Sequence, residues 1–176
     1  MRRLLALSGA LALLLPMKGE AQSGRLDTVT VSPTGAVRTI AAALARVRPG
    51  GRVVVTAGTY REPTITIAQP VELVGVGTPV LDGEGTHGIL LVTADDVTVR
   101  GLRLQNVGSS YVEDRAVIRV SDAKRCTITG NEIDDAFFGI YLAKVEGCRV
   151  ENNTLRAKNR TETTSGNGIH LWSTRD

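Results

Sequence analysis

The sequence predicts an all-β protein, a right-handed parallel β-helix in which each coil of the chain stacks on the one before it. First, a short segment recurs at spacings of 29, 22 and 29 residues, in the forms Gly88-Ile-Leu-Leu, Val117-Ile-Arg-Val, Gly139-Ile-Tyr-Leu and Gly168-Ile-His-Leu. Second, the first three copies are each followed, nine residues after they begin, by another strand with alternating apolar side chains. Third, all six prolines lie at or before Pro79, so later strands can donate every N–H to a neighbouring coil. A repeat of about 22 residues built from short β-runs is typical of one coil per repeat.

The second strands of the repeats are expected to fill the interior and to end at a sharp corner. Alignment puts three rows inside: Val97, Cys126 and Cys148; Val99, Ile128 and Val150; and Leu104, Ile133 and Leu155. The corner residues Gly101, Gly130 and Asn152 are of types that adopt a positive φ at little cost. Asn131 and Asn153 follow the corner, and we expect them to stack about 4.8 Å apart and to hydrogen-bond between coils. We interpret all five of these residues as structural.

The first strands of the repeats are expected to present one row of side chains to solvent. Their inward rows would be Ile89, Ile118, Ile140 and Ile169 together with Leu91, Val120, Leu142 and Leu171, and the outward row would be Leu90, Arg119, Tyr141 and His170. Both 29-residue steps are seven residues longer than the 22-residue step. In both, the extra residues fall between a second strand and the next first strand, at 108–115 and 158–167. Two loops should therefore bulge from the same edge, two coils apart.

Residues 1–21 have the pattern of a secretory signal peptide. Arg2 and Arg3 precede an apolar run over 4–15, and the segment closes on the small residue Ala21. The run is too short to span a bilayer. We therefore expect cleavage after Ala21 and export to the periplasm. Any association of the mature protein with the membrane should be peripheral. Three basic residues and one acidic residue leave with this segment, so 18 basic and 17 acidic residues remain and the net charge falls from +3 to +1. This near-neutral chain does not favour nucleic acid as a partner.

Residues 22–51 are expected to form an N-terminal strand and a capping helix. The strand is placed at 28–32, and Thr39 can cap a helix that ends at Pro49-Gly50-Gly51. The apolar face of that helix is formed by Ile40, Ala43, Leu44 and Val47. A plug of this kind would cover the apolar rows and open strand edges at the start of a solenoid.

Residues 52–176 are expected to form the coils. Irregular coils occupy 52–57, 64–67, 71–75 and Val80, and the regular ones begin at Gly88. The partner strand of the last repeat should begin directly after Asp176, so we expect the solenoid in this sequence to be incomplete at its C-terminal end.

The cysteines and histidines are the candidate metal ligands. Cys126 and Cys148 occupy equivalent positions in adjacent coils, with Cα atoms about 5 Å apart, which is within the range of a disulfide. Because inward, parallel side chains do not favour disulfide geometry, we favour a buried pair of thiols over a disulfide, and metal binding least. His87 and His170 lie about 14 Å apart along the stack, too far to share one ion. His170 is the better single ligand, although a surface histidine without a metal is the simpler interpretation.

The outward row also suggests a chemistry for acidic polysaccharides. Arg119, Tyr141 and His170, with Glu113, Asp114 and Arg115 in the first loop, could neutralise uronate carboxylates and exchange a C5 proton. We favour an ordinary solvated sheet face over catalysis. The pairs Asp95-Asp96 and Asp134-Asp135 should diverge to opposite faces of a strand, which makes them poor acid–base pairs.

Five phrases occur in a fixed order along the chain: Val55-Thr-Ala-Gly-Thr-Tyr60, Val71-Glu-Leu-Val-Gly75, Tyr111-Val-Glu-Asp-Arg-Ala116, Phe138-Gly-Ile-Tyr-Leu142 and Gly166-Asn-Gly-Ile-His-Leu-Trp172. With the signal peptide they resemble the N-terminal part of the NosD family, exported β-helix proteins of nitrous oxide reductase maturation. The resemblance implies a periplasmic partner of an ABC-type permease and ATPase that, with a copper chaperone, helps to assemble the copper centres of the reductase. It implies no catalytic residue.

The expected function is therefore that of an exported, non-enzymatic scaffold, with copper handled through the complex and no cofactor bound firmly by this chain. The first alternative is a β-helix lyase or C5-epimerase acting on acidic polysaccharide, in which Arg119, Tyr141 and His170 would be catalytic. The second alternative is a carbohydrate-binding or adhesion solenoid.

Overall fold

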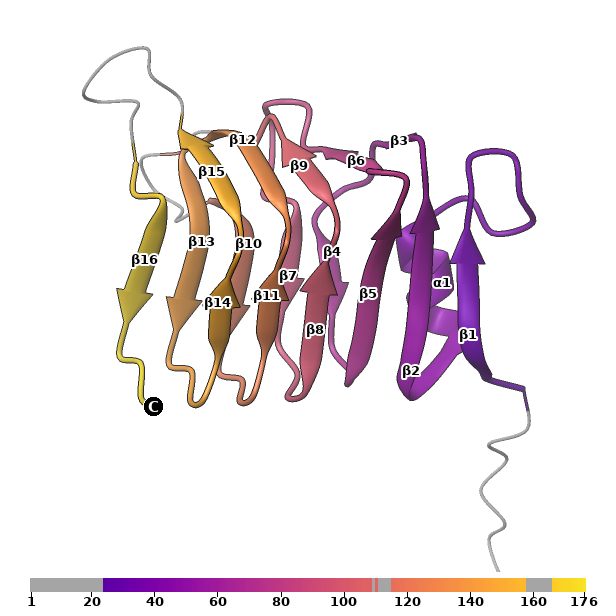
Figure 1. Cartoon of the computed structure of the whole chain (residues 1–176), viewed down its shortest axis with the longest axis horizontal. Coiled ribbons are helices and arrows are strands. Elements are labelled where there is room, and N and C mark those ends of the chain that lie inside the picture. The colour runs from indigo at the N-terminus through magenta and orange to yellow at the C-terminus, as the bar shows by residue number, and fades with distance from the viewer. Residues whose placement is uncertain (1–23, 109, 111–114, 158–165) are drawn as a thin grey trace, which may run out of the picture.

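A computed structural model describes residues 24–108, 110, 115–157 and 166–176 as a stack of β-coils with one short helix near its start (Figure 1). No helix in this part of the chain is long and apolar enough to cross a membrane. In chain order the elements are β1 (Leu26–Val31), α1 (Ile40–Arg46), β2 (Val47–Thr56), β3 (Thr59–Tyr60), β4 (Ile65–Ile67), β5 (Val71–Val76), β6 (Val80–Asp82), β7 (Leu90–Val92), β8 (Val97–Arg100), β9 (Arg103–Gln105), β10 (Ala116–Ser121), β11 (Thr127–Thr129), β12 (Glu132–Ala136), β13 (Phe138–Ala143), β14 (Arg149–Glu151), β15 (Thr154–Ala157) and β16 (Ile169–Trp172).

Three parallel sheets run along the stack. In spatial order, sheet A is β1-β2-β5-β8-β11-β14, sheet B is β3-β6-β9-β12-β15, and sheet C is β4-β7-β10-β13-β16. Neighbours within a sheet come from successive coils, and they pair in parallel. Figure 1 shows these strands side by side along the long axis of the molecule. The parallel β-helix predicted from the sequence is confirmed.

Stacked aliphatic rows fill the space between the three sheets. Val99, Ile128 and Val150 pair in register in sheet A, and Leu104, Ile133 and Leu155 pair in sheet B. Ile118 and Ile140 form the matching row of sheet C and are fully buried. Each buried Val, Leu or Ile side chain contributes about 1.5–3 kcal/mol relative to exposure, so the thin interior is stabilised by repetition of one contact pattern.

The predicted register of the first regular coil is wrong by one residue. Leu90 pairs with Ile118, and Leu91 pairs with Arg119, so Leu90 points inward and is 1 % exposed. The outward row is therefore Leu91, Arg119, Tyr141 and His170. The run Ile-Leu-Leu-Val at 89–92 has no alternation of apolar and polar residues, so the sequence contains no signal for which residues face inward.

Helix α1 packs against the first strands, as Figure 1 shows beside β1 and β2. Thr39 Oγ1 accepts a hydrogen bond from the Ala42 N–H at 3.2 Å, which is the predicted N-cap. The Glu62 carboxylate accepts two more, from the N–H groups of Ile40 at 2.7 Å and Ala41 at 3.1 Å. Ile40 and the other residues of the predicted apolar face, Ala43, Leu44 and Val47, are buried. The helix thus covers part of the interior near the first coil.

The predicted end of this helix is wrong. The helix ends at Arg46, and Pro49-Gly50-Gly51 lie within β2. Leu26 of β1 pairs with Val47 of β2, and Thr28 pairs with Arg52, so β2 has extra residues between these two pairs. These residues form a bulge that accommodates Pro49. Glycine and proline therefore mark a strand irregularity here instead of a helix terminus.

One corner between sheets A and B is built from a column of small residues. The column consists of Gly75, Gly101, Gly130 and Asn152. Each comes directly after a strand residue that pairs in register with the equivalent residue of the neighbouring coil. Gly101, Gly130 and Asn152 have φ values of 70°, 63° and 55°. These are the three positions that the sequence predicts as the corner, and their backbone has the left-handed conformation that glycine and asparagine tolerate.

A carboxylate on the outer face of sheet A ties three coils together. Glu72 accepts a hydrogen bond from Arg52 Nε at 2.5 Å and another from Arg100 Nε at 2.8 Å. Partial burial raises the pKa of Glu72, but the hydrogen bonds and charges of Arg100 and Arg52 outweigh it, and the net pKa is lowered. The carboxylate is therefore ionised at neutral pH, where it links the coils.

Candidate functional site

The predicted outward row lies on sheet C and joins three adjacent coils. Arg119 in β10 pairs with Tyr141 in β13, and Tyr141 pairs with His170 in β16. Because all three strands are parallel and in register, their side chains emerge one above another. The structure therefore brings together the three residues that the sequence singled out.

The three side chains are engaged with one another. The Arg119 guanidinium carbon lies 4.8 Å from the centre of the Tyr141 ring, and the His170 ring centre lies 4.7 Å from it at an interplanar angle of 31°. Phe138 packs edge-on against Tyr141 at 5.7 Å. Tyr141 is only 6 % exposed and belongs, with Ala116 and Ala143, to a small buried cluster separate from the main core. The row is a packed cation–aromatic stack.

His170 has a polar neighbour on its own coil. The side-chain amide nitrogen of Asn167 lies 3.1 Å from His170 Nδ1, and if the amide donates, the imidazole proton sits on Nε2. Among the residues that the structure describes, no group of three or more His, Cys, Asp or Glu side chains is placed to hold a metal ion. His170 as a metal ligand therefore stays a prediction, with no such group around it in that part of the chain.

The loop residues proposed for the polysaccharide site are only partly described. Glu113 and Asp114 lie outside the described residues. Arg115 is described, and its guanidinium donates a hydrogen bond to the carbonyl oxygen of Thr86 in the preceding coil.

Asn131 and Asn153 stack between the coils at the corner. Asn131 Nδ2 donates to Val99 O and to Asn153 Oδ1, both at 3.0 Å, and Asn131 Oδ1 accepts from the Leu102 N–H at 3.1 Å. Asn153 Nδ2 donates to Ile128 O at 2.8 Å. Asn131 is 1 % exposed. Both amides hydrogen-bond to the main chain, as expected of structural residues.

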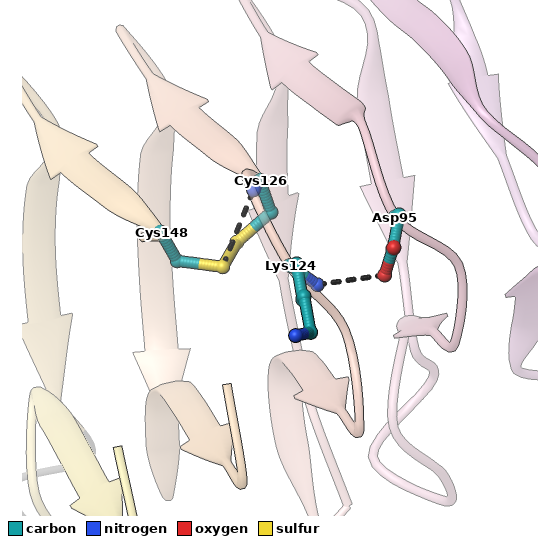
Figure 2. The surroundings of a disulfide bond; sticks show 4 residues. All are labelled: Asp95, Lys124, Cys126 and Cys148. Atoms are coloured by element: carbon teal, nitrogen blue, oxygen red, sulfur yellow. Dashed lines mark hydrogen bonds between the residues drawn. A yellow bond between two sulfur atoms is a disulfide. The ribbon is translucent and has the colours of Figure 1, made fainter. Parts of the chain in front are cut away.

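Cys126 and Cys148 form a disulfide, in contrast to the pair of thiols that the sequence favoured (Figure 2). Their Cα atoms are 4.5 Å apart, close to the predicted spacing. The stacking interval itself brings the sulfur atoms into bonding range. The expected alignment of the two cysteines is correct, but the predicted pair of thiols is wrong because the two sulfurs turn toward each other.

A column of alternating charges, which sequence reasoning missed, lines the turn that precedes these cysteines. Lys124 Nζ and Glu146 Oε2 form an ion pair at 2.9 Å across adjacent coils. The main chain of Glu146 forms an isolated parallel β-bridge with the main chain of Arg175 in the next coil. Figure 2 shows the Lys124 N–H donating to Asp95 in the coil before. Lys124, Glu146 and Arg175 also line a cavity of about 330 Å³. The 29- and 22-residue spacings of the charged residues were the signal that could have revealed it.

The same turn corrects the prediction for Asp95 and Asp96. Both carboxylates reach Arg125, Asp96 at 2.7 Å and Asp95 at 3.4 Å, instead of diverging. The expectation assumed extended backbone, but Asp96 has a φ of 56° and lies in a turn. The Arg125 hydrogen bonds lower the pKa of Asp96, which disfavours a role as a general acid.

Solved structures share this fold at low sequence identity. An alginate lyase from a Paenibacillus species superposes with a TM-score of 0.58 and 17 % identity, covering 84 % of this chain and 57 % of the lyase. A pectin methylesterase mutant in complex with a hexasaccharide gives a TM-score of 0.52 and 16 % identity, covering 76 % of this chain and 57 % of the esterase. These likenesses show the β-helix fold alone.

Curated relatives are more similar in sequence. A "Probable ABC transporter binding protein NosD" of Pseudomonas aeruginosa is 33 % identical over 128 residues, which cover 72 % of this chain and 30 % of the relative. A protein of the same description from Stutzerimonas stutzeri is 29 % identical over 175 residues, which cover 94 % of this chain and 36 % of the relative. The chain thus spans about a third of the length of these relatives. A family model described as "Periplasmic copper-binding protein (NosD)" matches residues 76–176, more than half of the sequence, and the chain belongs to the NosD family.

Proposed function

We propose that this chain is part of an exported, non-enzymatic accessory protein that assists assembly of the copper centres of nitrous oxide reductase. Its partners would be an ABC-type permease and ATPase, a copper chaperone and the reductase. The family match over 76–176 supports this proposal, as do the two curated relatives described as ABC transporter binding proteins. Because the chain spans only about a third of those relatives, the activity and partners of the whole protein are part of the proposal.

The observation that carries the non-enzymatic part of the proposal is the stacking of the outward row. A proton-transfer residue must reach its substrate. Tyr141 is buried, with the Arg119 guanidinium and the His170 imidazole against its ring. To act on a sugar, the tyrosine would have to leave these contacts and the edge-on packing of Phe138. This geometry favours a rigid surface over a lyase or epimerase site.

The described residues do not fit a resident copper site in the oxidised chain. Copper favours imidazole and sulfur ligands. Both cysteines of the chain are joined in the disulfide, and disulfide sulfurs lack the thiolate charge that binds metals. In the described part of the chain, His170 does not belong to any group of three or more His, Cys, Asp or Glu side chains that could hold a metal ion. We therefore assign to this segment a role as scaffold, with copper as cargo of the complex.

The export part of the proposal rests on residues 1–21. We expect the periplasmic form to begin at Gln22, after cleavage behind Ala21. Intact-mass measurement of protein released from the periplasm would show this N-terminus, and a mass that includes residues 1–21 would contradict it.

Binding to the permease is the direct test of the proposed partnership. The full-length protein that contains this segment, immobilised through a tag, should retain the permease and ATPase from solubilised membranes that contain both. Membranes that lack the permease serve as the control. Equal retention of the ATPase in the two cases would contradict the proposal. Formation of unsaturated uronate products from alginate or pectate by the purified protein would instead support the lyase alternative.

A further inference from the structure

Aromatic side chains gather on the outer face of sheet C. Phenylalanine, tyrosine and tryptophan make up only 3 % of the chain, yet Phe138, Tyr141 and Trp172 all lie on this face, on the neighbouring strands β13 and β16. The His170 ring centre lies 5.5 Å from that of Phe138 and 4.7 Å from that of Tyr141. Trp172 is 52 % exposed. Aromatic residues and arginine supply much of the binding energy at protein–protein interfaces, so this concentration in an aromatic-poor chain indicates an interface.

The same face is cationic. The described strands of sheet C, which are β4, β7, β10, β13 and β16, contain Arg119 and His170 but no Asp or Glu. Sheets A and B differ, because their outer faces carry carboxylates such as Glu72 in sheet A and Asp134 in sheet B. The charge of the sheet C face therefore complements an anionic partner.

A cavity of about 330 Å³ adjoins this face, at the turns that directly follow β10, β13 and β16. Lys144 Nζ, in the cavity lining, lies 5.5 Å from the centre of the Trp172 ring, so the cavity and the aromatic face share an edge. The charged residues of the lining are three cations and two carboxylates: Lys124, Lys144, Arg175, Asp122 and Glu146. The lining thus has an excess of positive charge that can receive a further carboxylate.

We propose that the outer face of sheet C and the adjoining cavity bind an extended, acidic segment of a protein partner. Apolar side chains of the segment pack against the exposed Trp172, and a carboxylate enters the cavity beside Lys144 and Arg175. The source of the segment, a protein of the copper-assembly complex, rests on the proposed function. The acidic chemistry of the segment rests on the face itself.

An acidic polysaccharide fits this face less well. A sugar ring packs flat on an open aromatic ring, but Tyr141 is 6 % exposed and has the Arg119 guanidinium and the His170 imidazole against its ring. Lys144 lies over the ring of Trp172. A protein segment does not need an open ring face, because its side chains can contact ring edges and the cations around them.

The test is site-specific photo-cross-linking of the full-length protein in cells that also produce the permease, the ATPase, the copper chaperone and the reductase. Benzoylphenylalanine replaces Trp172 or, as the control, Arg149, an exposed residue of β14 in sheet A. We expect an adduct from position 172 and none from position 149. Mass spectrometry of the adduct should identify a partner peptide that contains several Asp or Glu residues.

Charge reversal tests the role of the cavity. With the cross-linker at position 172, Lys144→Glu and Arg175→Glu should each lower the adduct yield roughly tenfold, because like charges that face each other across an interface are strongly unfavourable. Arg149→Glu makes the same change of charge on sheet A and should leave the yield unchanged. Circular dichroism verifies that each variant keeps its β signal.

Four outcomes would overturn the proposal: no adduct from position 172, equal adducts from positions 172 and 149, a partner peptide without carboxylates, or equal effects of Lys144→Glu and Arg149→Glu. An adduct that is degraded by alginate or pectate lyase would overturn it in favour of a polysaccharide. An acidic peptide from a protein outside the copper-assembly complex would support this inference while contradicting the proposed partnership, so the two failures are distinguishable.

Discussion

Gly75→Ala is expected to destabilise the protein by about 3 kcal/mol, because the corner column leaves no room for a methyl group at that coil. A Cβ on Gly75 would lie 2.0 Å from the carbonyl oxygen of Gly101 and 2.7 Å from its carbonyl carbon. Both atoms are main chain of the next coil, so relief requires the coils to separate. For a domain of this size the loss corresponds to a fall in Tm of about 10 °C, measurable by thermal unfolding followed by circular dichroism.

Gly130→Asn is the matched control in the same column. Gly130 has a φ of 63°, and a Cβ there would have no heavy atom within 4 Å. Asn152 already occupies the next position of the column with a φ of 55°. We therefore expect a change of about 0.5 kcal/mol or less. If Gly75→Ala were as mild as this control, the close approach of the coils at Gly75 and Gly101 would be wrong.

Asn131→Ala is expected to cost a similar amount, about 3 kcal/mol, for a different reason. The substitution removes the acceptor of the Leu102 N–H and the donor to Val99 O in a fully buried setting. Two main-chain groups would then be left without partners and without access to water, and each such group costs about 1–3 kcal/mol. Urea unfolding at neutral pH would measure the loss as a lower midpoint.

Asn153→Ala is the comparison for the asparagine stack. This amide is partly buried; its Nδ2 donates to Ile128 O at 2.8 Å, and its Oδ1 accepts from the Asn131 N–H at 3.0 Å. We expect a loss comparable to that of Asn131→Ala, because two main-chain groups of fully buried residues again lose their partners. Equal, small effects of the two substitutions would show that the amides do not link the coils.

Periodicity in the sequence was enough to predict most of the solenoid. Rows such as Val99, Ile128 and Val150 could be aligned because polar residues alternate with them, and because Gly101 and Gly130 mark the same corner in each coil. Where that alternation disappears, at residues 89–92, the predicted register of Leu90 was wrong. The end of α1 was wrong for a related reason, since Pro49 and Gly50 are consistent with both a helix terminus and a strand bulge.

The site was predictable in its placement but not in its chemistry. Register alone puts Arg119, Tyr141 and His170 in one column, whereas the burial of Tyr141 depends on how Phe138 and neighbouring side chains pack outside sheet C. The disulfide depended likewise on side-chain rotation, which a 22-residue spacing does not determine. The charges of Lys124 and Glu146 were visible in the sequence. That these side chains form an ion pair could be recognised only once the turns were known to stack.

The copper content of nitrous oxide reductase would show whether this NosD-family chain belongs to an accessory protein of copper-centre assembly. The reductase would be purified from a strain that lacks the gene for this protein and from the same strain with the gene restored. We predict that the first preparation contains folded reductase deficient in copper, and that the second contains the full complement. Equal, full copper content in both preparations would contradict the proposed role in copper-centre assembly.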